Sequence, residues 1–133
     1  MKSRRRIVLA AVIVLIAIIT AVFGAKSYIE ASLVKLTETS IPDVDLSKIA
    51  DGVYKGSHKV FPVEAEVRVT IENHKIIGIE LVKHFNGQGT AAEVIPDRVT
   101  EAQSLGVDIV SGATYSSKVI LKAIENALQS ANR

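Results

Sequence analysis

The sequence predicts an α+β protein in which one N-terminal transmembrane helix precedes a compact domain with an antiparallel sheet packed against helices. Three features carry this prediction: an uncharged apolar run near the N-terminus, a ten-residue alternation of apolar and polar side chains, and an apolar stripe at helical spacing near the C-terminus. A chain of 133 residues has room for one small domain beside the anchor, which excludes a two-domain cofactor enzyme.

Residues 7–25 form the apolar run, in which only Thr20 is polar. At 1.5 Å per residue, a helix of this length spans roughly 28 Å, close to the thickness of the hydrocarbon core of a bilayer. The alternative is a secretory signal cleaved after Gly24, but the run is longer than the apolar region of such signals, and we favour the uncleaved anchor. Basic residues before the run stay on the cytoplasmic side, which predicts single-pass insertion in the cell membrane with an extracytoplasmic C-terminal domain. These residues are Lys2, Arg4, Arg5 and Arg6.

The chain after the apolar run is mildly acidic, because the four basic residues before the run are not counted with it. Of the 16 basic side chains, 12 remain in the 108 residues after the run, against all 14 acidic ones, which gives a net charge of −2. An acidic domain without a basic patch argues against nucleic-acid binding. The absence of cysteine excludes disulfides, a thiol nucleophile and iron–sulfur ligation.

We predict four segments along the chain: a cytoplasmic basic segment at residues 1–6, the anchor at 7–25, a stalk or linker at 26–47, and a folded domain at 48–133. Ile29, Leu33 and Leu36 recur at helical spacing, so the anchor helix is expected to continue as a short stalk. It is expected to end before Pro42, which disfavours helix in the residue ahead of it.

The domain begins with strands. The alternation over residues 63–72 predicts a half-buried strand, and Asn73-His74 is a plausible tight turn. Ile77, Ile79 and Leu81 resume the period of two, so the two runs are predicted to form an antiparallel hairpin, with a further strand at residues 54–60. Residues 85–90 contain two glycines and are predicted to form a loop.

Two helices follow. Residues 96–104 are predicted to be helical, with Pro96 in the first turn and Leu105-Gly106 closing the helix. The last helix is predicted to begin within residues 114–117. Its apolar stripe comprises Val119, Ile120, Ala123, Ile124, Ala127 and Leu128. Its expected outer face comprises Lys118, Lys122, Glu125 and Gln129.

The segment at residues 108–117, D-I-V-S-G-A-T-Y-S-S, lies directly before that last helix. Four hydroxyl side chains and a glycine meet there at the positive end of a helix dipole, which is a favourable place for a phosphate. The alternative from residue types alone is an ordinary helix N-cap, since one Ser or Thr suffices for capping.

The pattern D-x-x-S-G-A-T at residues 108–114 resembles the small FMN-binding domain of flavoproteins in bacterial respiratory and Rnf-type electron-transport complexes. The resemblance includes D-G-V-Y-K-G at residues 51–56, the loop at 83–89 and E-A-Q-S at 101–104, and thus covers roughly residues 50–130. It implies FMN as the cofactor, joined by its phosphate to a threonine hydroxyl by a metal-dependent flavin transferase outside the cytoplasm.

Carried over by position, Thr114 is the acceptor, Asp108 and Ser111 are recognition or positioning residues, and Gly112 and Ala113 leave the approach open. Further residues expected to bind the cofactor are Tyr115, Ser116, Ser117, His84, Gly87 and Gly89. The flavin ring needs a flat apolar surface to pack against, which an aromatic side chain can provide. For each candidate aromatic, packing in the core is the alternative role. These aromatics are Tyr54, Phe61, Phe85 and Tyr115.

The resemblance implies an electron carrier rather than a stand-alone enzyme, which relays electrons between membrane-bound or extracytoplasmic redox proteins. Two alternatives stay open: a reductase module that delivers electrons directly to a small extracellular acceptor, and a tethered interaction module without redox activity. His58, His74 and His84 lack metal-ligand spacing, so no metal site is predicted.

Overall fold

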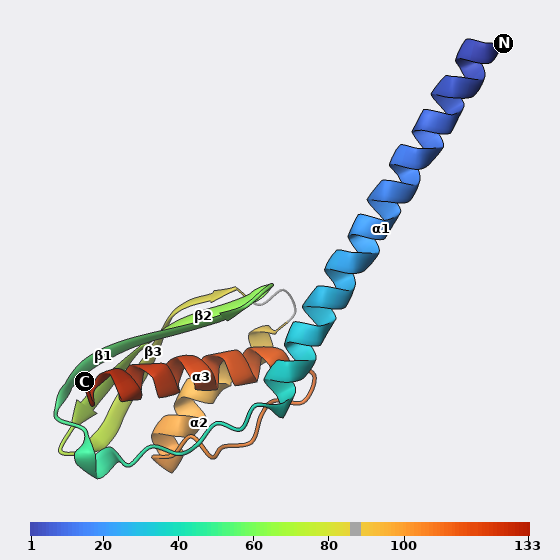
Figure 1. Ribbon diagram of the computed structural model, residues 1–133. Coiled ribbons are helices and arrows are strands. Elements are labelled where there is room, and N and C mark those ends of the chain that lie inside the picture. Colours follow the sequence, from blue (N-terminus) through green and yellow to red (C-terminus); the bar gives the residue numbers. More distant parts are fainter. Residues whose placement is uncertain (86–88) are drawn as a thin grey trace. The chain divides into compact units, whose positions relative to one another are not determined.

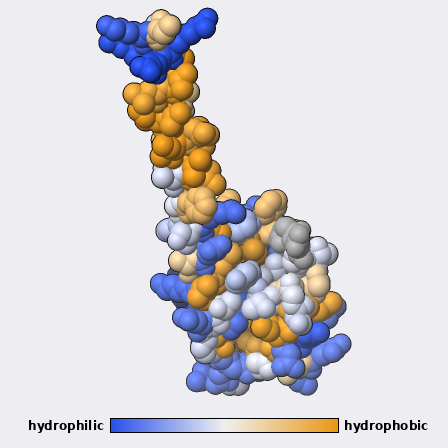
Figure 2. Space-filling view, turned by 90° about the vertical axis from the view of Figure 1, so that its right-hand side faces the viewer, coloured by the Kyte–Doolittle hydropathy of each residue, from blue (hydrophilic) through white to orange (hydrophobic). Residues whose placement is uncertain are grey.

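The computed structural model describes residues 1–85 and 89–133, which divide into two units, Met1–Ser32 and Leu33–Arg133. The first unit is the larger part of helix α1 (Lys2–Glu38) (Figure 1), and its surface is hydrophobic beyond a hydrophilic N-terminal end (Figure 2). This helix is long and apolar enough to cross a membrane, and the chain buries none of its apolar stretch. Such a helix fits single-pass anchoring, because hydrocarbon removes the cost of exposing apolar side chains to water.

The second unit contains a three-stranded antiparallel sheet in the order β1-β2-β3, formed by β1 (Gly52–Val60), β2 (Val63–Glu72) and β3 (Lys75–Phe85) (Figure 1). Alternate side chains of β2 point to one face and are buried there: Val63, Ala65, Val67, Val69 and Ile71. The turn at Asn73 and His74 has positive φ at both residues, as tight two-residue hairpin turns require. The predicted α+β fold and the predicted hairpin are confirmed.

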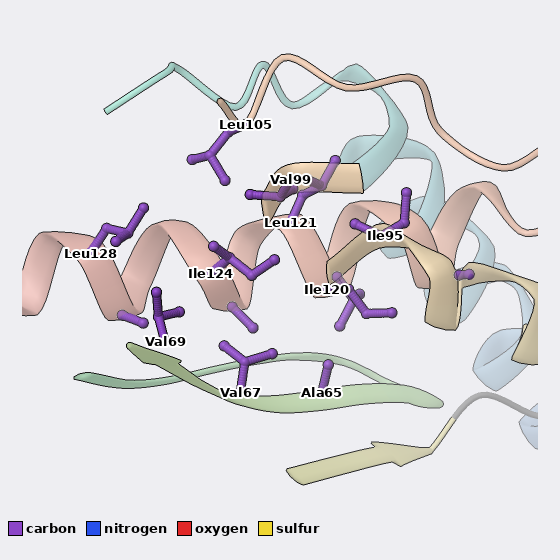
Figure 3. Packing of buried hydrophobic residues seen from close by; sticks show 14 of the residues in the cluster. Ala65, Val67, Val69, Ile95, Val99, Leu105, Ile120, Leu121, Ile124 and Leu128 are labelled. Atoms are coloured by element: carbon purple, nitrogen blue, oxygen red, sulfur yellow. The ribbon is translucent and has the colours of Figure 1, made fainter. Parts of the chain in front are cut away.

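Helix α3 (Thr114–Ser130) packs against the buried face of the sheet, because its apolar stripe covers the inward side chains of β2. Figure 3 shows this contact between Ala65, Val67 and Val69 of β2 and Ile120, Ile124 and Leu128 of α3. The helix therefore begins at the end of the sheet where β2 starts. A 3-10 turn (Thr90–Val94) and helix α2 (Ile95–Ala102) complete the domain core.

The segment between Leu33 and β1 also belongs to the second unit. Leu36, in the last turn of α1, is buried in the core of this unit, and Lys118 Nζ donates to Thr39 O at 2.9 Å. Asp43 accepts hydrogen bonds from Ser104 Oγ and Leu105 N. A short 3-10 turn at Leu46–Lys48 then leads to β1. These contacts attach the segment firmly to the domain.

One residue of β3 and one of α3 lie on the opposite side from the one predicted. Ile77 is 50% exposed, because β3 bulges opposite Thr70 and Ile71, and Ile76 takes the buried position instead. Glu125 is buried instead of facing solvent. Its carboxylate lies 2.5 Å from Lys122 Nζ and accepts from Gln129 Nε2 at 2.7 Å, so the buried charge has partners.

Helix α2 also ends differently from the prediction. It ends at Ala102, and Gln103 adopts a left-handed conformation with φ of 52°, so Leu105-Gly106 does not form the C-cap. The Gln103 amide then accepts from Ile76 N and donates to Ile76 O, both at 2.8 Å. This pair of hydrogen bonds ties the end of α2 to strand β3.

Candidate functional site

A tight turn places Thr114 at the first position of α3. The turn spans Val110–Ala113 and is closed by a hydrogen bond of 3.0 Å from Ala113 N to Val110 O. Gly112 has φ of +81° at the third position, which is the conformation of a type II turn and favours glycine there. A Cβ at Gly112 would meet nothing within 4 Å, so backbone conformation rather than crowding accounts for the glycine.

The hydroxyl cluster around Thr114 does not cap α3, so the interpretation as an ordinary N-cap is wrong. The N-cap residue is Ala113, and no side chain forms a capping hydrogen bond. Ala113 is itself 5% exposed, with its methyl group packed in the core. Within the described part of the chain, the first-turn N–H groups of α3 are therefore left uncapped, and the positive end of the helix dipole is available to an anion.

A hollow of about 260 Å³ lies at this helix start. Its walls come from the beginning of β2, the residue after the 86–88 segment, the tight turn and the first turn of α3. It is lined by Val63, Gly89, Gly112, Ala113, Thr114, Tyr115 and Ser116. The structure thus brings together the predicted acceptor and five of the other ten predicted cofactor-binding residues, which come from two separate parts of the chain.

Asp108 lies on a second, more open hollow of about 700 Å³ against α2. Arg98 and Glu101 line the same hollow, and Arg98 Nη1 donates to Asp108 O at 2.9 Å. Ser111 is exposed on the tight turn, between Asp108 and Thr114 in the chain. The motif therefore presents Thr114 and Asp108 on separate surfaces. Sequence reasoning missed Arg98, because nothing in the pattern of α2 indicates a contact with a carbonyl ten residues later.

Two predicted site residues that do not line the hollow at Thr114, Ser117 and His84, have buried side chains. Ser117 is 0% exposed, and its Oγ accepts from Val110 N at 3.1 Å. The His84 side chain is 2% exposed, and its Nδ1 lies 3.0 Å from Glu93 Oε1. His84 pairs with Ala65 in the sheet register, which places it on the face that α3 covers. Gly87 lies outside the described residues.

The aromatic side chains divide into two kinds. Tyr54 is half-buried and its hydroxyl donates to Ala50 O at 2.9 Å, so it has a structural role. Phe61 and Phe85 are 63% and 61% exposed, and Tyr115 is 39% exposed. Phe61 lies two residues before Val63, and Phe85 pairs with Glu64, so both lie at the end of the sheet that carries Thr114. Core packing therefore does not account for these three rings.

Residues 62–129 match the FMN-binding domain, and the chain belongs to this family. Its cofactor is FMN. The matched range runs from the start of β2 through α3 and includes every residue that lines the hollow at Thr114. Among the residues that the structure describes, no group of three or more His, Asp or Glu side chains is arranged to hold a metal ion.

The chain is similar to two other proteins over part of its length. The chain is 34% identical over 86 residues to an uncharacterized protein of Treponema pallidum (strain Nichols). It is 31% identical over 84 residues to NADH:acrylate oxidoreductase of Vibrio harveyi. These alignments cover 62% and 61% of this chain, but 24% and 8% of the two relatives, so the chain corresponds to a minor part of each.

The residues at the hollow fit the chemistry of FMN. The uncapped helix start and the Thr114 hydroxyl suit a phosphate, because N–H and O–H donors and the helix dipole stabilise negative charge. The flavin ring is flat and largely apolar, and Tyr115, which is 39% exposed, offers apolar surface at the same hollow. The residues at the hollow could therefore hold FMN.

Proposed function

We propose that this protein is a membrane-anchored, extracytoplasmic flavoprotein that carries FMN in a phosphodiester bond to Thr114 and relays electrons between redox partners. One observation carries the proposal: Thr114 stands at the S-G-A-T position of a chain of the FMN-binding family, on a hollow at the uncapped start of α3. Its hydroxyl is thus an oxygen nucleophile on an accessible surface, next to donors that suit a phosphate.

The attachment requires an activated flavin. A new bond forms between Thr114 Oγ and the flavin phosphorus, and a bond from that phosphorus to a leaving group must break. A flavin dinucleotide meets this need: its pyrophosphate is cleaved, nucleoside monophosphate leaves, and the threonine proton passes to a base of the transferase. No electrons are transferred in this step. The exposed Asp108 and Ser111 are then available for recognition by that transferase.

The membrane topology is the second part of the proposal. The apolar helix follows a cluster of basic residues, and the positive-inside rule keeps such a cluster in the cytoplasm. The domain after the helix would then lie outside, where a dissociable cofactor would be lost by dilution. Covalent attachment solves this problem, which supports the combination of an anchor with an acceptor threonine.

The redox role follows from the cofactor. Bound flavin supplies the electron-transfer chemistry, and the chain attaches the flavin, orients it and determines its location in the cell. FMN as the cofactor supports electron relay to membrane-bound or extracytoplasmic redox proteins. Because one relative is an oxidoreductase, direct reduction of a small extracellular acceptor is the second candidate. Rapid turnover of such an acceptor by the full-length flavinylated chain alone would favour that candidate.

Replacement of the acceptor tests the proposal. The full chain, produced in a bacterium with a flavin transferase, is expected to fluoresce on a denaturing gel and to gain the mass of one FMN less one water. Thr114→Ala is expected to lose both signals, because the alanine methyl group offers no oxygen nucleophile. Thr100→Ala is the matched control, since the Thr100 hydroxyl donates to Pro96 O within α2 and its loss should leave attachment intact. Flavin retained on Thr114→Ala after denaturation would exclude Thr114 as the attachment point.

A further inference from the structure

The backbone that leads to Thr114 is held by side chains from two helices, Arg98 of α2 and Ser117 of α3. Arg98 donates to Asp108 O at 2.9 Å, and Ser117 Oγ accepts from Val110 N at 3.1 Å. We infer that Arg98 and Ser117 are positioning residues for flavin attachment, which orient the acceptor turn and its recognition residue without touching the flavin. This inference rests on the proposed function, since it takes Thr114 as the acceptor.

Ser117 contacts both ends of the tight turn. Its Oγ receives the N–H of Val110, where the turn begins, and its own N–H donates to Ala113 O at 2.9 Å, where the turn ends. The residue is 0% exposed, so it presents no surface to a cofactor in the hollow at Thr114. A buried hydroxyl bonded to the turn backbone is therefore suited to orienting Thr114 rather than to binding FMN.

Loss of the Ser117 hydroxyl has a specific consequence. Val110 N is partly buried, and a buried donor without an acceptor carries a desolvation penalty. The turn is expected to shift so that this amide reaches water, and Ala113 and Thr114 would move with it. Attachment needs the acceptor oxygen aligned with phosphorus, and small displacements reduce such rates strongly.

Arg98 acts at the other end of the segment. Its guanidinium holds the carbonyl of Asp108, so it restrains the backbone from which the Asp108 side chain projects. Both residues line the same open hollow against α2, which is a surface that a transferase can reach. Because Arg98 is exposed, the effect of its removal should be smaller than that of Ser117, and its variants should fold normally.

The test measures flavin incorporation into the full chain in detergent micelles, with a purified flavin transferase and flavin adenine dinucleotide as the donor. Ser117→Ala is expected to lower kcat for incorporation about tenfold with little change in KM, because the acceptor oxygen is misplaced while the docking surface is kept. Ser117→Thr keeps the hydroxyl and is expected to recover most of the rate. Arg98→Ala is expected to lower kcat/KM about threefold, and Arg98→Lys to recover part of the loss.

Ser130→Ala is the matched control. It removes a serine hydroxyl from the same helix, where Ser130 Oγ donates to Ala127 O at 2.6 Å, far from the turn. Hydrogen exchange gives a second readout without any transferase: the Val110 amide should exchange faster in Ser117→Ala and at the wild-type rate in Ser130→Ala. Faster exchange at Val110 together with slower incorporation supports positioning.

The outcomes separate this inference from the proposed function. Wild-type rates for both Ser117→Ala and Arg98→Ala, on a protein that labels at Thr114, would overturn the inference alone. Equal slowing in Ser117→Ala and Ser130→Ala would also overturn it, because the loss would then reflect general destabilisation. A wild-type chain that accepts no flavin from an active transferase would overturn the proposed function and the inference together.

Discussion

The Asp43 carboxylate connects the segment before β1 to the loop after α2. Its Oδ2 accepts from Ser104 Oγ at 2.6 Å, and its Oδ1 accepts from Leu105 N and Val44 N, both at 3.0 Å. Partial burial by itself raises the pKa of Asp43, but the hydrogen bonds from Ser104, Leu105 and Val44 outweigh it and lower the pKa below its ordinary value. Asp43 thus stabilises the fold in its charged form.

The sign of this pKa shift predicts a pH dependence of stability. A carboxylate with a lowered pKa in the folded state contributes stability above its unfolded pKa of about 3.9, and this contribution is lost as the pH falls through the folded pKa. Asp43→Asn is expected to reduce the free energy of unfolding at pH 7 by about 1 kcal/mol, a figure discounted for solvent screening. The difference from wild type should shrink at pH 3.

Urea titrations of both proteins at pH 7 and pH 3 measure this difference. Asp45→Asn is the control, because the Asp45 pKa is lowered mainly by its hydrogen bonds to Ser47 and Lys48 within one turn. Its effect on stability should be smaller than that of Asp43→Asn. A loss that is equally large at both pH values would show that the Asp43 charge is not the source of the stability.

At the scale of residues, the sequence predicts the site where the chemistry is local. Thr114, Gly112 and their neighbours follow one another in the chain, so a short motif identifies them. Arg98 and Asp43 act on backbone groups that are distant in sequence, and Leu105 N lies 62 positions from Asp43. No local pattern specifies such contacts, because they depend on how separate elements pack.

At the scale of elements, β1 and α3 approach each other closely at Gly56. A Cβ built on Gly56 would lie 2.1 Å from Ala123 O and 2.4 Å from Ala127 N. Asn126 Nδ2 also donates to Ser57 O at 2.8 Å, which adds a hydrogen bond between α3 and β1 next to Gly56. Glycine therefore allows the helix backbone to approach this edge strand, and any side chain would separate them.

Gly56→Ala is accordingly expected to lower the free energy of unfolding by about 3 kcal/mol, since overpacking against rigid backbone forces strand and helix apart. Gly78→Ala on β3 is the matched control. A Cβ there would meet nothing within 4 Å, and the change should be close to neutral. Thermal unfolding followed by circular dichroism measures both variants. Equal melting temperatures for Gly56→Ala and Gly78→Ala would contradict the close β1–α3 packing.

The strands and helices could be predicted from the spacing of apolar residues, whereas single residues that depart from this spacing could not. The alternation in β2 holds along its whole length, because one face is uniformly covered by α3. In β3, a bulge moves Ile77 out of the buried row. The alternation of apolar and polar residues in the sequence does not indicate where a bulge lies. Glu125 looks like a surface residue until Lys122 and Gln129, one turn away on either side, supply partners for its carboxylate.

At the scale of the whole molecule, the two units differ in how they place apolar side chains. Residues 1–32 form a unit whose helix is exposed and is long and apolar enough to cross a membrane, and residues 33–133 form a unit with its own core. The sequence predicts a domain boundary at residue 48, shortly before the Asp51-Gly52 turn. Contacts of the domain core, however, begin with Leu36 in the last turn of α1.

Two truncations distinguish these boundaries. A chain of residues 33–133 retains Leu36, the Lys118–Thr39 hydrogen bond and the Asp43 bonds, so it should remain in solution without detergent and melt at the temperature of the full chain's domain. A chain of residues 48–133 loses all three, and its free energy of unfolding should fall by about 3 kcal/mol or more, as for the loss of a buried leucine. Sedimentation with lipid vesicles provides the control, because only the full chain should sediment. If residues 48–133 melted as high as residues 33–133, the segment before β1 would be a passive linker, and the predicted boundary at residue 48 would hold.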